Sequence, residues 1–400
     1  MERLLKNRMF SLNAGLSSLG MLALAGFGHA QVADMLSAFD AGSRSSGAGG
    51  ALTGASPDTL ATYYNPAALA YIDRKTLNIV QKNLPNGRNS VVGKYYDQTK
   101  TTTNRSGNQA VTHVGFAVPM SSLRKGGIGT LAFSYTIGGY LEESSTGPTN
   151  SALELIPGLG VRNFTEKKSA KSEFYTLAYG RTNGAGNFAY GVGLTVVNQL
   201  MQLRQTGLLV DGSGNEINPG ASPISFPNVR TNGTGLGLLA GVMFSPVNNP
   251  DLSVWASLRT PIELNGVSKD AVSYDRIPGR LIAGGAIRRD GFRKGAQDYL
   301  VLATQVTYYF SGGASQFFDR SSQSVTSVGA EYYLVLGLAR VPLRVGYQGI
   351  TKGGRGFASR KGLTYGIGFQ PGNGKYVLDL NYFQPSGGGG DTSITATYRF

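Results

Sequence analysis

The chain has no cysteine, one tryptophan and two histidines among its 400 residues. Without cysteine it can form neither a disulfide framework nor a lipoprotein anchor, and thiol-based metal or nucleophile chemistry is excluded as well. His29 lies in the predicted leader described below, so the mature chain keeps only His113. One histidine excludes clustered histidine ligands and nearly every Ser/His/Asp catalytic scheme. We therefore expect no metal, no cofactor and no enzymatic activity.

Charged residues and long apolar runs are also scarce. Charged residues make up 15% of the chain, against roughly a quarter in soluble proteins, whereas glycine, with 58 residues, is about twice as frequent as usual. After residue 30 the longest apolar stretch, 236–244, is short and interrupted by glycine, so we expect no membrane-spanning helix. Without such a helix, only a closed barrel could satisfy the backbone inside a membrane. Abundant glycine and tyrosine with little charge suit a β-protein whose outer face meets lipid.

The first residues have the pattern of a secretory signal. Three basic residues precede an apolar stretch and a small-x-small cleavage pattern: Arg3, Lys6 and Arg8, then 19–27, then Gly28-His29-Ala30. We predict a cleaved signal peptide over 1–30 and expect the mature chain in the bacterial outer membrane.

The formal net charge of +14 is strongly basic. Nucleic acid is the first partner to consider for such a charge, but secretion separates the chain from it. The basic residues are spread over predicted loops and turns, as in Lys167-Lys168 and Arg360-Lys361. Attraction to anionic phosphates at the membrane surface, or plain solvation, explains them better. We expect outer-membrane lipids and lipopolysaccharide as partners, and no nucleic acid.

Apolar and polar residues alternate with period two in many segments, which indicates strands with one apolar face. In 341–348 the apolar side chains share one face and Arg344 lies on the other, and Asp379 lies likewise in 376–383. Charged residues thus fall on the face that would point into a barrel. The last segment ends on Phe400 and resembles the closing strand of outer-membrane barrels, so we expect it to engage the barrel-assembly machinery. A soluble edge strand would leave this aromatic row exposed.

Fourteen such segments can be marked, and an even number fits single-chain bacterial barrels. They are 75–82, 111–119, 127–141, 172–181, 187–202, 231–245, 252–263, 279–289, 298–310, 324–336, 341–350, 362–370, 375–384 and 391–400. Connections after odd-numbered strands are mostly long and those after even-numbered strands short, which places both termini in the periplasm. The sequence therefore predicts an all-β fold, a 14-stranded antiparallel transmembrane β-barrel over 75–400.

The segment before the barrel, 31–74, is rich in glycine and does not have the pattern of a strand pair. Gly47–Gly54 invites a phosphate-loop interpretation, but no Lys-Ser/Thr pair follows and no strand precedes it, so a nucleotide site is disfavoured. The segment contains Gly42-Ser43-Arg44, Gly49-Gly50-Ala51, Asp58 and Tyr63-Tyr64-Asn65-Pro66-Ala67. These motifs resemble the N-terminal hatch of the FadL family of outer-membrane transporters for fatty acids and other hydrophobic compounds. Further on, Phe244-Ser245-Pro246, Leu252–Trp255 and Leu258–Ile262 are similar to that family's strand, turn and strand.

The resemblance implies a barrel whose lumen is sealed by the hatch. It also implies that a captured ligand leaves sideways, through a gap made by an inward kink in the third strand. Asn65, Pro66 and Ala67 would be the hatch residues near that kink. Gly138 and Gly139 are our candidates for the kink because glycine permits the bend and leaves ladder bonds unmade. Two glycines that make room for an inward neighbour are an equal alternative.

Two predicted loops, 142–171 and 203–230, are too apolar for free solvation. The candidates for ligand capture in the first are Leu153, Leu155, Ile156 and Leu159. Packing of the loops on each other explains these residues equally well. No basic residue can be assigned to a ligand carboxylate, because the family's binding residues lack a local motif that matches here.

The function implied by these patterns is passive uptake of hydrophobic small molecules, either long-chain fatty acids or hydrocarbons, through a hatch-gated, laterally opening barrel. The alternative is a PorV-like branch of the same fold, which binds protein cargo in secretion. A membrane enzyme such as a phospholipase would need His113 as its base. We favour a lumenal or loop histidine without a catalytic role.

Overall fold

The computed structural model describes residues 44–400 except for short internal segments. Those segments are 84–86, 96–97, 107–108, 121–128, 148–158, 212–214, 216–223, 226–228, 266–275, 292, 294–296, 312–318, 352–353, 356–358 and 387–389. The predicted signal peptide, 1–30, and the first residues of the predicted hatch segment lie outside the described residues.

Fourteen antiparallel strands form a closed barrel, as predicted. In order along the chain and around the barrel they are β1 (Thr76–Asn83), β4 (Gln109–Met120), β5 (Gly129–Gly147), β6 (Leu159–Thr182), β7 (Phe188–Asp211), β9 (Val229–Phe244), β10 (Leu252–Arg259), β13 (Arg280–Asp290), β14 (Tyr299–Tyr309), β16 (Gln323–Leu336), β17 (Ala339–Ile350), β19 (Arg360–Pro371), β20 (Tyr376–Pro385) and β21 (Asp391–Arg399). The ring closes because β1 pairs with β21 on one side and with β4 on the other.

The barrel has a turn end, where β16 and β17 or β19 and β20 meet across tight turns, and a loop end, where the longer connections lie. The last residue, Phe400, lies at the turn end, where its backbone N–H donates to the carbonyl of Lys75 at 2.9 Å. The two ends of the barrel sequence thus meet at one rim. This agrees with the predicted alternation of long and short connections.

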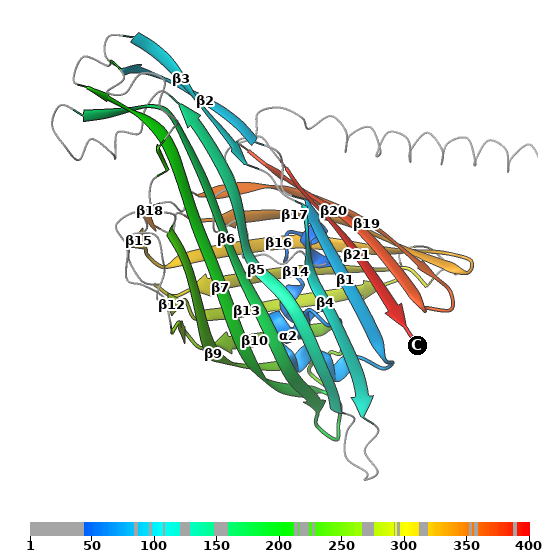
Figure 1. The fold of residues 1–400 in the computed structure, drawn as a ribbon. Helices are drawn as coiled ribbons and strands as arrows, with labels where there is room; N and C mark the ends of the chain where they lie inside the picture. The colour runs from blue at the N-terminus through cyan, green and yellow to red at the C-terminus, as the bar shows by residue number, and fades with distance from the viewer. Residues whose placement is uncertain are drawn as a thin grey trace, which may run out of the picture.

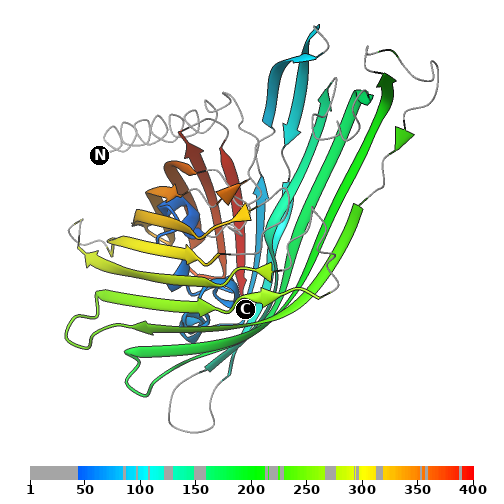
Figure 2. The same ribbon diagram turned by 90° about the vertical axis from the view of Figure 1, so that its left-hand side faces the viewer.

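The loop end is taller on one side than the sequence predicts. β6 and β7 have 24 residues each, whereas a membrane crossing needs about 9–11. Much of the predicted loop 142–171 is therefore strand, and the predicted loop 83–110 contains the hairpin of β2 (Gly87–Tyr95) and β3 (Gln98–Ser106). These strands rise together past the rest of the barrel (Figures 1 and 2). Shorter pieces are β8 (Ile224–Ser225), β11 (Ile262–Glu263), β12 (Arg276–Ile277), β15 (Asp319–Arg320) and β18 (Gly354–Arg355).

These extensions have a physical cause that the sequence pattern does not display. β3 is threonine-rich and polar, with no apolar face, so its sequence shows no alternation of apolar and polar residues. Its backbone pairs with β2 along its length and with β5 at Thr103–Ser106. Strand preference depends on the neighbour that a segment finds, and here the neighbouring strands supply it.

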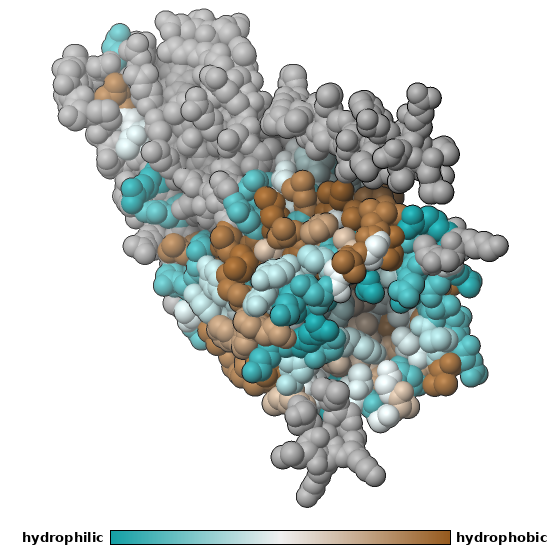
Figure 3. Space-filling model, turned by 90° about the vertical axis from the view of Figure 1, so that its right-hand side faces the viewer, coloured by the Kyte–Doolittle hydropathy of each residue, from teal (hydrophilic) through white to brown (hydrophobic). Residues whose placement is uncertain are grey.

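The predicted faces of the strands are confirmed. Val345 and Tyr347 are about half exposed on the outside of β17, whereas Arg344 and Gly346, which alternate with them, are buried in the lumen. The same alternation places Asp379 inside and Leu380 outside on β20. An apolar belt therefore surrounds the barrel, and Figure 3 shows part of it as brown patches across the middle of one face.

A hatch of four short helices lies in the lumen and is drawn in blue in Figures 1 and 2. Its elements are η2 (Arg44–Ala48), η3 (Thr53–Ala55), α2 (Ala61–Tyr64) and η4 (Pro66–Tyr71). Most of their residues are buried, and Tyr71 at the end of η4 is exposed. None of the helices that the structure describes has the length and apolarity to cross a membrane.

Candidate functional site

The Asn-Pro-Ala segment of the hatch is seated on glycines of three neighbouring strands. A Cβ at Gly180 of β6 would lie 2.4 Å from the Pro66 carbonyl oxygen, and one at Gly191 of β7 would lie 2.3 Å from the Pro66 carbonyl carbon. A Cβ at Gly241 of β9 would lie 1.9 Å from Asn65 Oδ1. Only glycine therefore lets the hatch approach this part of the wall so closely.

Asn65 fixes the local shape of the hatch. Its Oδ1 accepts from the backbone N–H of Ala67 at 3.1 Å and so caps η4, where Pro66 occupies the first position. Its Nδ2 donates to the carbonyl of Gly54 at 2.7 Å and ties η4 to η3. The motif that carries the family resemblance is thus a helix cap that joins two hatch turns.

Two carbonyls at the end of α2 are held by β10 and β13, the next strands around the barrel after β9. Arg280 Nη2 donates to the Tyr63 carbonyl, and Ser257 Oγ donates to the Tyr64 carbonyl at 2.6 Å. The last carbonyls of a helix have no hydrogen-bond partner within the helix, so these two bonds satisfy carbonyls that would otherwise be unpaired. The guanidinium of Arg280 also lies 4.5 Å from the centre of the Tyr63 ring, and that of Arg259 lies 5.7 Å from it.

Other hatch contacts are polar as well. The hydroxyl of Thr364 accepts from the N–H of Gly49 at 2.7 Å and donates to the carbonyl of Gly47 at 2.9 Å. In the middle of the hatch, Asp58 accepts from Leu60 N and from Ser56 Oγ, and its burial raises the pKa of the carboxyl group. The hatch is therefore held by many hydrogen bonds to the wall and within itself.

A buried ion-pair network joins the start of the hatch to the far wall. Arg344 pairs with Glu331 on β16 and lies 2.7 Å from Asp379 on β20. Arg44 of the hatch lies 3.6 Å from Glu331 and donates to the Tyr333 hydroxyl at 2.6 Å. Two guanidinium groups and two carboxylates thus balance each other in the lumen, as buried charges require.

The wall between β4 and β5 is interrupted. Within the described part of the chain, β5 pairs with β4 from Gly129 to Thr136 and, on the same side, with β3 from Glu143. Over the same stretch β5 remains paired with β6, with a bulge between Ile137 and Gly139. The described backbone thus has a break in its ladder, with the bulge at the start of the break.

Gly138, the bulged residue, touches the hatch. A Cβ there would lie 2.3 Å from the Phe174 ring and 2.8 Å from the Tyr63 hydroxyl. The hatch residue at the bulge is therefore Tyr63, two positions before Asn65, whereas the Asn-Pro-Ala segment itself lies against β6, β7 and β9. Tyr63 also stacks edge-on with Phe174 at 5.2 Å.

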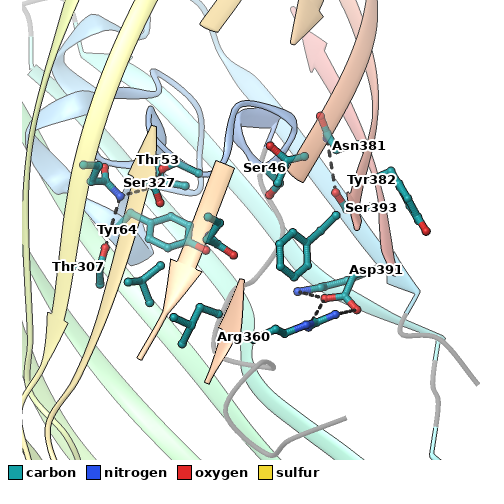
Figure 4. A pocket seen from close by; sticks show the side chains of 18 of the residues that line it. Ser46, Thr53, Tyr64, Thr307, Ser327, Arg360, Asn381, Tyr382, Asp391 and Ser393 are labelled. Carbon is teal, nitrogen blue, oxygen red and sulfur yellow. Dashed lines mark hydrogen bonds and ion pairs between the residues drawn. The ribbon is translucent and has the colours of Figure 1, made fainter. Parts of the chain in front are cut away.

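A pocket lies in the lumen between the hatch and the loop end. Hatch residues Thr53 and Tyr64 line one side, and Arg360 and Asp391 from the loop-end parts of β19 and β21 line another (Figure 4). Many of its other lining side chains carry hydroxyl or amide groups, and Phe383 provides an apolar wall.

His113 is completely buried between the hatch and the wall. One ring nitrogen lies 2.8 Å from the Thr59 hydroxyl and the other lies 2.8 Å from the Thr136 hydroxyl. Both nitrogens therefore have neutral threonine partners, and neither contacts a carboxylate that would orient a general base. Across the residues that the structure describes, no group of three or more His, Cys, Asp or Glu side chains is placed to hold a metal.

The chain matches no family model and no curated protein. It does match solved structures. A FadL homologue of Pseudomonas aeruginosa aligns with a TM-score of 0.57 and 15% identity over 94% of this chain and 100% of the other. The toluene transporter TodX of P. putida aligns with a TM-score of 0.58 and 12% identity, covering 89% and 97%. The chain has the FadL-type fold.

A further FadL-type neighbour is the toluene transporter TbuX of Ralstonia pickettii, with a TM-score of 0.56 and 16% identity over 90% of this chain and 98% of that one. Together these neighbours confirm the FadL-type resemblance that was read from the hatch motif. TbuX and TodX are toluene transporters by their names.

Within this FadL-type barrel the predicted site residues have different outcomes. Asn65, Pro66 and Ala67 lie in the hatch, and Gly138 lies at the bulge of the third barrel strand; their part in gating stays a prediction. Gly139 lies just past the bulge in β5. Of the candidates for ligand capture, Leu153, Leu155 and Ile156 lie outside the described residues, and Leu159 begins β6.

Sequence reasoning missed the lumenal polar residues. Arg259, Arg280 and Ser257 have inward positions that alternation assigns to the lumen, but their hatch partners lie about 200 residues away in the chain. Lys82, Arg360 and Asp391 come from the first, twelfth and last barrel strands. Only the closure of the barrel brings such residues together.

Proposed function

We propose that this protein is a channel of the bacterial outer membrane for passive uptake of hydrophobic small molecules, with the loop end outside and the turn end in the periplasm. The observation that carries the proposal is a lumen closed by a hatch, with a pocket above the hatch and a break in the wall beside it. The FadL-type fold supports it. Burial of an apolar ligand would drive binding by ~0.8 kcal/mol per methylene.

The proposed exit is the break between β4 and β5. A closed ladder leaves no passage through a barrel wall, because each strand is bonded to both neighbours. Among the described residues, β5 has no ladder partner on the β4 side over Ile137–Tyr140. Tyr63 lies at the bulge, so a shift of the hatch at Tyr63 would change the access to this break.

The function is tested by uptake of a labelled long-chain fatty acid and of labelled toluene into cells with and without the protein. We expect the protein to accelerate uptake of at least one of the two. Equal uptake with and without it, across several hydrophobic compounds, contradicts the proposal.

Deletion of Gly138 tests the lateral route. Gly138 is the extra residue of the bulge, so its removal leaves Ile137 opposite Glu173 and brings Gly139 in line with Ser172. β5 could then continue its ladder along β4, and uptake should fall to the level of cells without the protein. Gly193→Ala, where the nearest atom to a Cβ is 3.3 Å away, is the control and should transport normally. Undiminished uptake by the folded deletion variant would show that the ligand leaves along the barrel axis.

Binding of protein cargo, as in PorV-like barrels, stays a prediction. Co-purification of a secreted protein with the barrel, persisting after the removal of any lipid ligand, is the measurement that would support it.

A further inference from the structure

We infer that the lumenal pocket selects compounds that combine an apolar body with an uncharged hydroxyl group, such as phenols and alcohols, and that Ser327 and Gln348 bind this hydroxyl group. The inference rests on the proposed function and deepens it, because it names a substrate class within the hydrophobic small molecules. A hydrocarbon of the same size is then the weaker ligand.

The lining of the pocket is largely polar, which is the first argument. Among the described residues that line it, the purely apolar side chains are those of Val325, Ile350 and Phe383. Amide and hydroxyl side chains of β14, β16 and β17 make up much of the rest, namely Gln305, Thr307, Gln323, Ser327 and Gln348. A hydrocarbon that covers such groups removes them from water and offers no hydrogen bond in return, which costs free energy.

Three of these polar side chains form a row across the wall beside the hatch. Gln305 on β14 pairs in register with Ser327 on β16, and Ser327 pairs with Gln348 on β17. The amide of Gln305 is occupied by the hatch, because its Nε2 donates to Thr53 Oγ1 at 2.7 Å and its Oε1 accepts from the N–H of Gly54 at 2.9 Å. Figure 4 shows Ser327 on the same side of the pocket as Thr53. Gln305 thus holds the hatch, and a ligand has to use the other two members of the row.

Ser327 and Gln348 have hydrogen-bonding atoms to offer. Gln348 Nε2 donates to the hatch carbonyl of Gly49 at 3.2 Å, so Oε1 is the end of the amide that remains for a ligand. Within the described part of the chain, no protein group hydrogen-bonds to Gln348 Oε1 or to the Ser327 hydroxyl. A serine hydroxyl both donates and accepts, whereas an amide oxygen accepts. A ligand hydroxyl group can therefore accept from Ser327 and donate to Gln348.

The hatch leaves both groups open to the pocket. Gly50 of the hatch has a φ of 77°, and a Cβ there would lie 3.2 Å from Gln348 Nε2 and 3.7 Å from Ser327 Oγ. Because glycine has no side chain, the hatch backbone passes these groups without covering them. Val325 and Ile350, the next inward residues of the two strands, pair with each other and also line the pocket. A ligand whose hydroxyl group lies at the polar pair thus has an apolar surface beside it for its body.

The test compares binding of para-cresol and toluene, which share a methyl-substituted ring and differ in the hydroxyl group, to the full-length barrel in nanodiscs at neutral pH. The phenol is uncharged there, as a tyrosine side chain is. Calorimetry gives the two affinities, and empty nanodiscs supply the heat of partition into lipid. We expect para-cresol to bind at least about tenfold more tightly, as two hydrogen bonds allow.

Ser327→Ala and Gln348→Met test the assignment of the two residues. Both variants should bind para-cresol about as weakly as toluene. Neither should bind toluene less tightly than the natural protein does, because toluene makes no hydrogen bond to the removed group, and a misfolded barrel could not retain this binding. Thr326→Ala is the matched control, since Thr326 precedes Ser327 and is exposed on the outer face of β16, and it should keep the preference.

Equal affinities for para-cresol and toluene in the natural protein overturn the inference, as does a preference that persists in both folded variants. Uptake of the two labelled compounds into cells separates this inference from the proposed function. A barrel that neither binds nor transports either compound counts against the proposed function itself, whereas equal binding and transport of both counts against the hydroxyl site alone.

Discussion

Replacing Gly191 by alanine is expected to unseat the hatch. The new Cβ would lie 2.3 Å from the Pro66 carbonyl carbon and 2.6 Å from the Ala67 nitrogen. These are backbone atoms in a turn that Asn65 holds, so they cannot rotate away as a flexible side chain could. Either β7 or the hatch must move.

The size of the effect follows from overpacking. Inserting a methyl group into a tightly packed contact costs about 1–3 kcal/mol. If the hatch relieves this strain by moving, its displaced population rises by roughly 5- to 150-fold. The control is Gly193→Ala, two residues further along β7 and also inward, where the nearest atoms to a new Cβ are 3.3–3.6 Å away. This variant should keep the hatch seated.

Conductance of single barrels in planar bilayers measures the displaced hatch as openings to ions. Gly191→Ala should open more often than the natural protein, and Gly193→Ala should not. The heat-dependent shift of folded barrels on denaturing gels shows whether each variant has folded. If folded Gly191→Ala opens no more often than Gly193→Ala, the hatch is not seated by this contact and the reasoning fails.

Two further predictions concern stability. Arg344→Met removes the guanidinium beside Asp379 and one of the two beside Glu331, which should lower the free energy of unfolding by about 3–5 kcal/mol. Urea unfolding in vesicles measures this loss, and a loss of under about 1 kcal/mol would contradict the prediction. At the turn end, hydrogen bonding from Arg293 lowers the pKa of Asp298 below its usual value. The ionised form therefore stabilises the barrel above about pH 4, and this contribution is lost as the pH falls further. Asp298→Asn should flatten the dependence of the urea midpoint on pH below that value, and an unchanged slope would argue against the ion pair.

The barrel was predictable from the sequence because its information is local. A lipid-facing strand must alternate, so each segment such as 341–348 or 376–383 reports its own two faces. The short turns show which strands are neighbours, and the final aromatic strand marks the end of the barrel. These signals come from neighbouring residues, and the structure confirms them.

The hatch contacts were not predictable, because they join residues that no local pattern connects. The resemblance placed Asn65–Ala67 near the kink, but the glycines that accept this segment lie on β6, β7 and β9, and Tyr63 lies at the bulge instead. A Cβ at Gly138 would also lie 2.3 Å from the Phe174 ring, so the absence of a side chain leaves room for that ring. Gly138 thus lies both at the bulge and at a closely packed contact.

The hatch is attached to the wall by many weak contacts, each of which can break on its own. Hydrogen bonds such as those from Ser257 and Thr364 contribute about 0.5–1.5 kcal/mol each, and the alanines of η4 bury little apolar surface per residue. Tyr63 differs, because it joins two such contacts: its carbonyl and ring meet Arg280, and its hydroxyl lies at the bulge. A displacement of this one residue would release the cation and uncover the break in the wall together. We therefore expect the coupling between hatch and wall to act through Tyr63. The variant Tyr63→Phe, which keeps the ring and the carbonyl, should affect the contacts of the hydroxyl with the bulge and with Arg259.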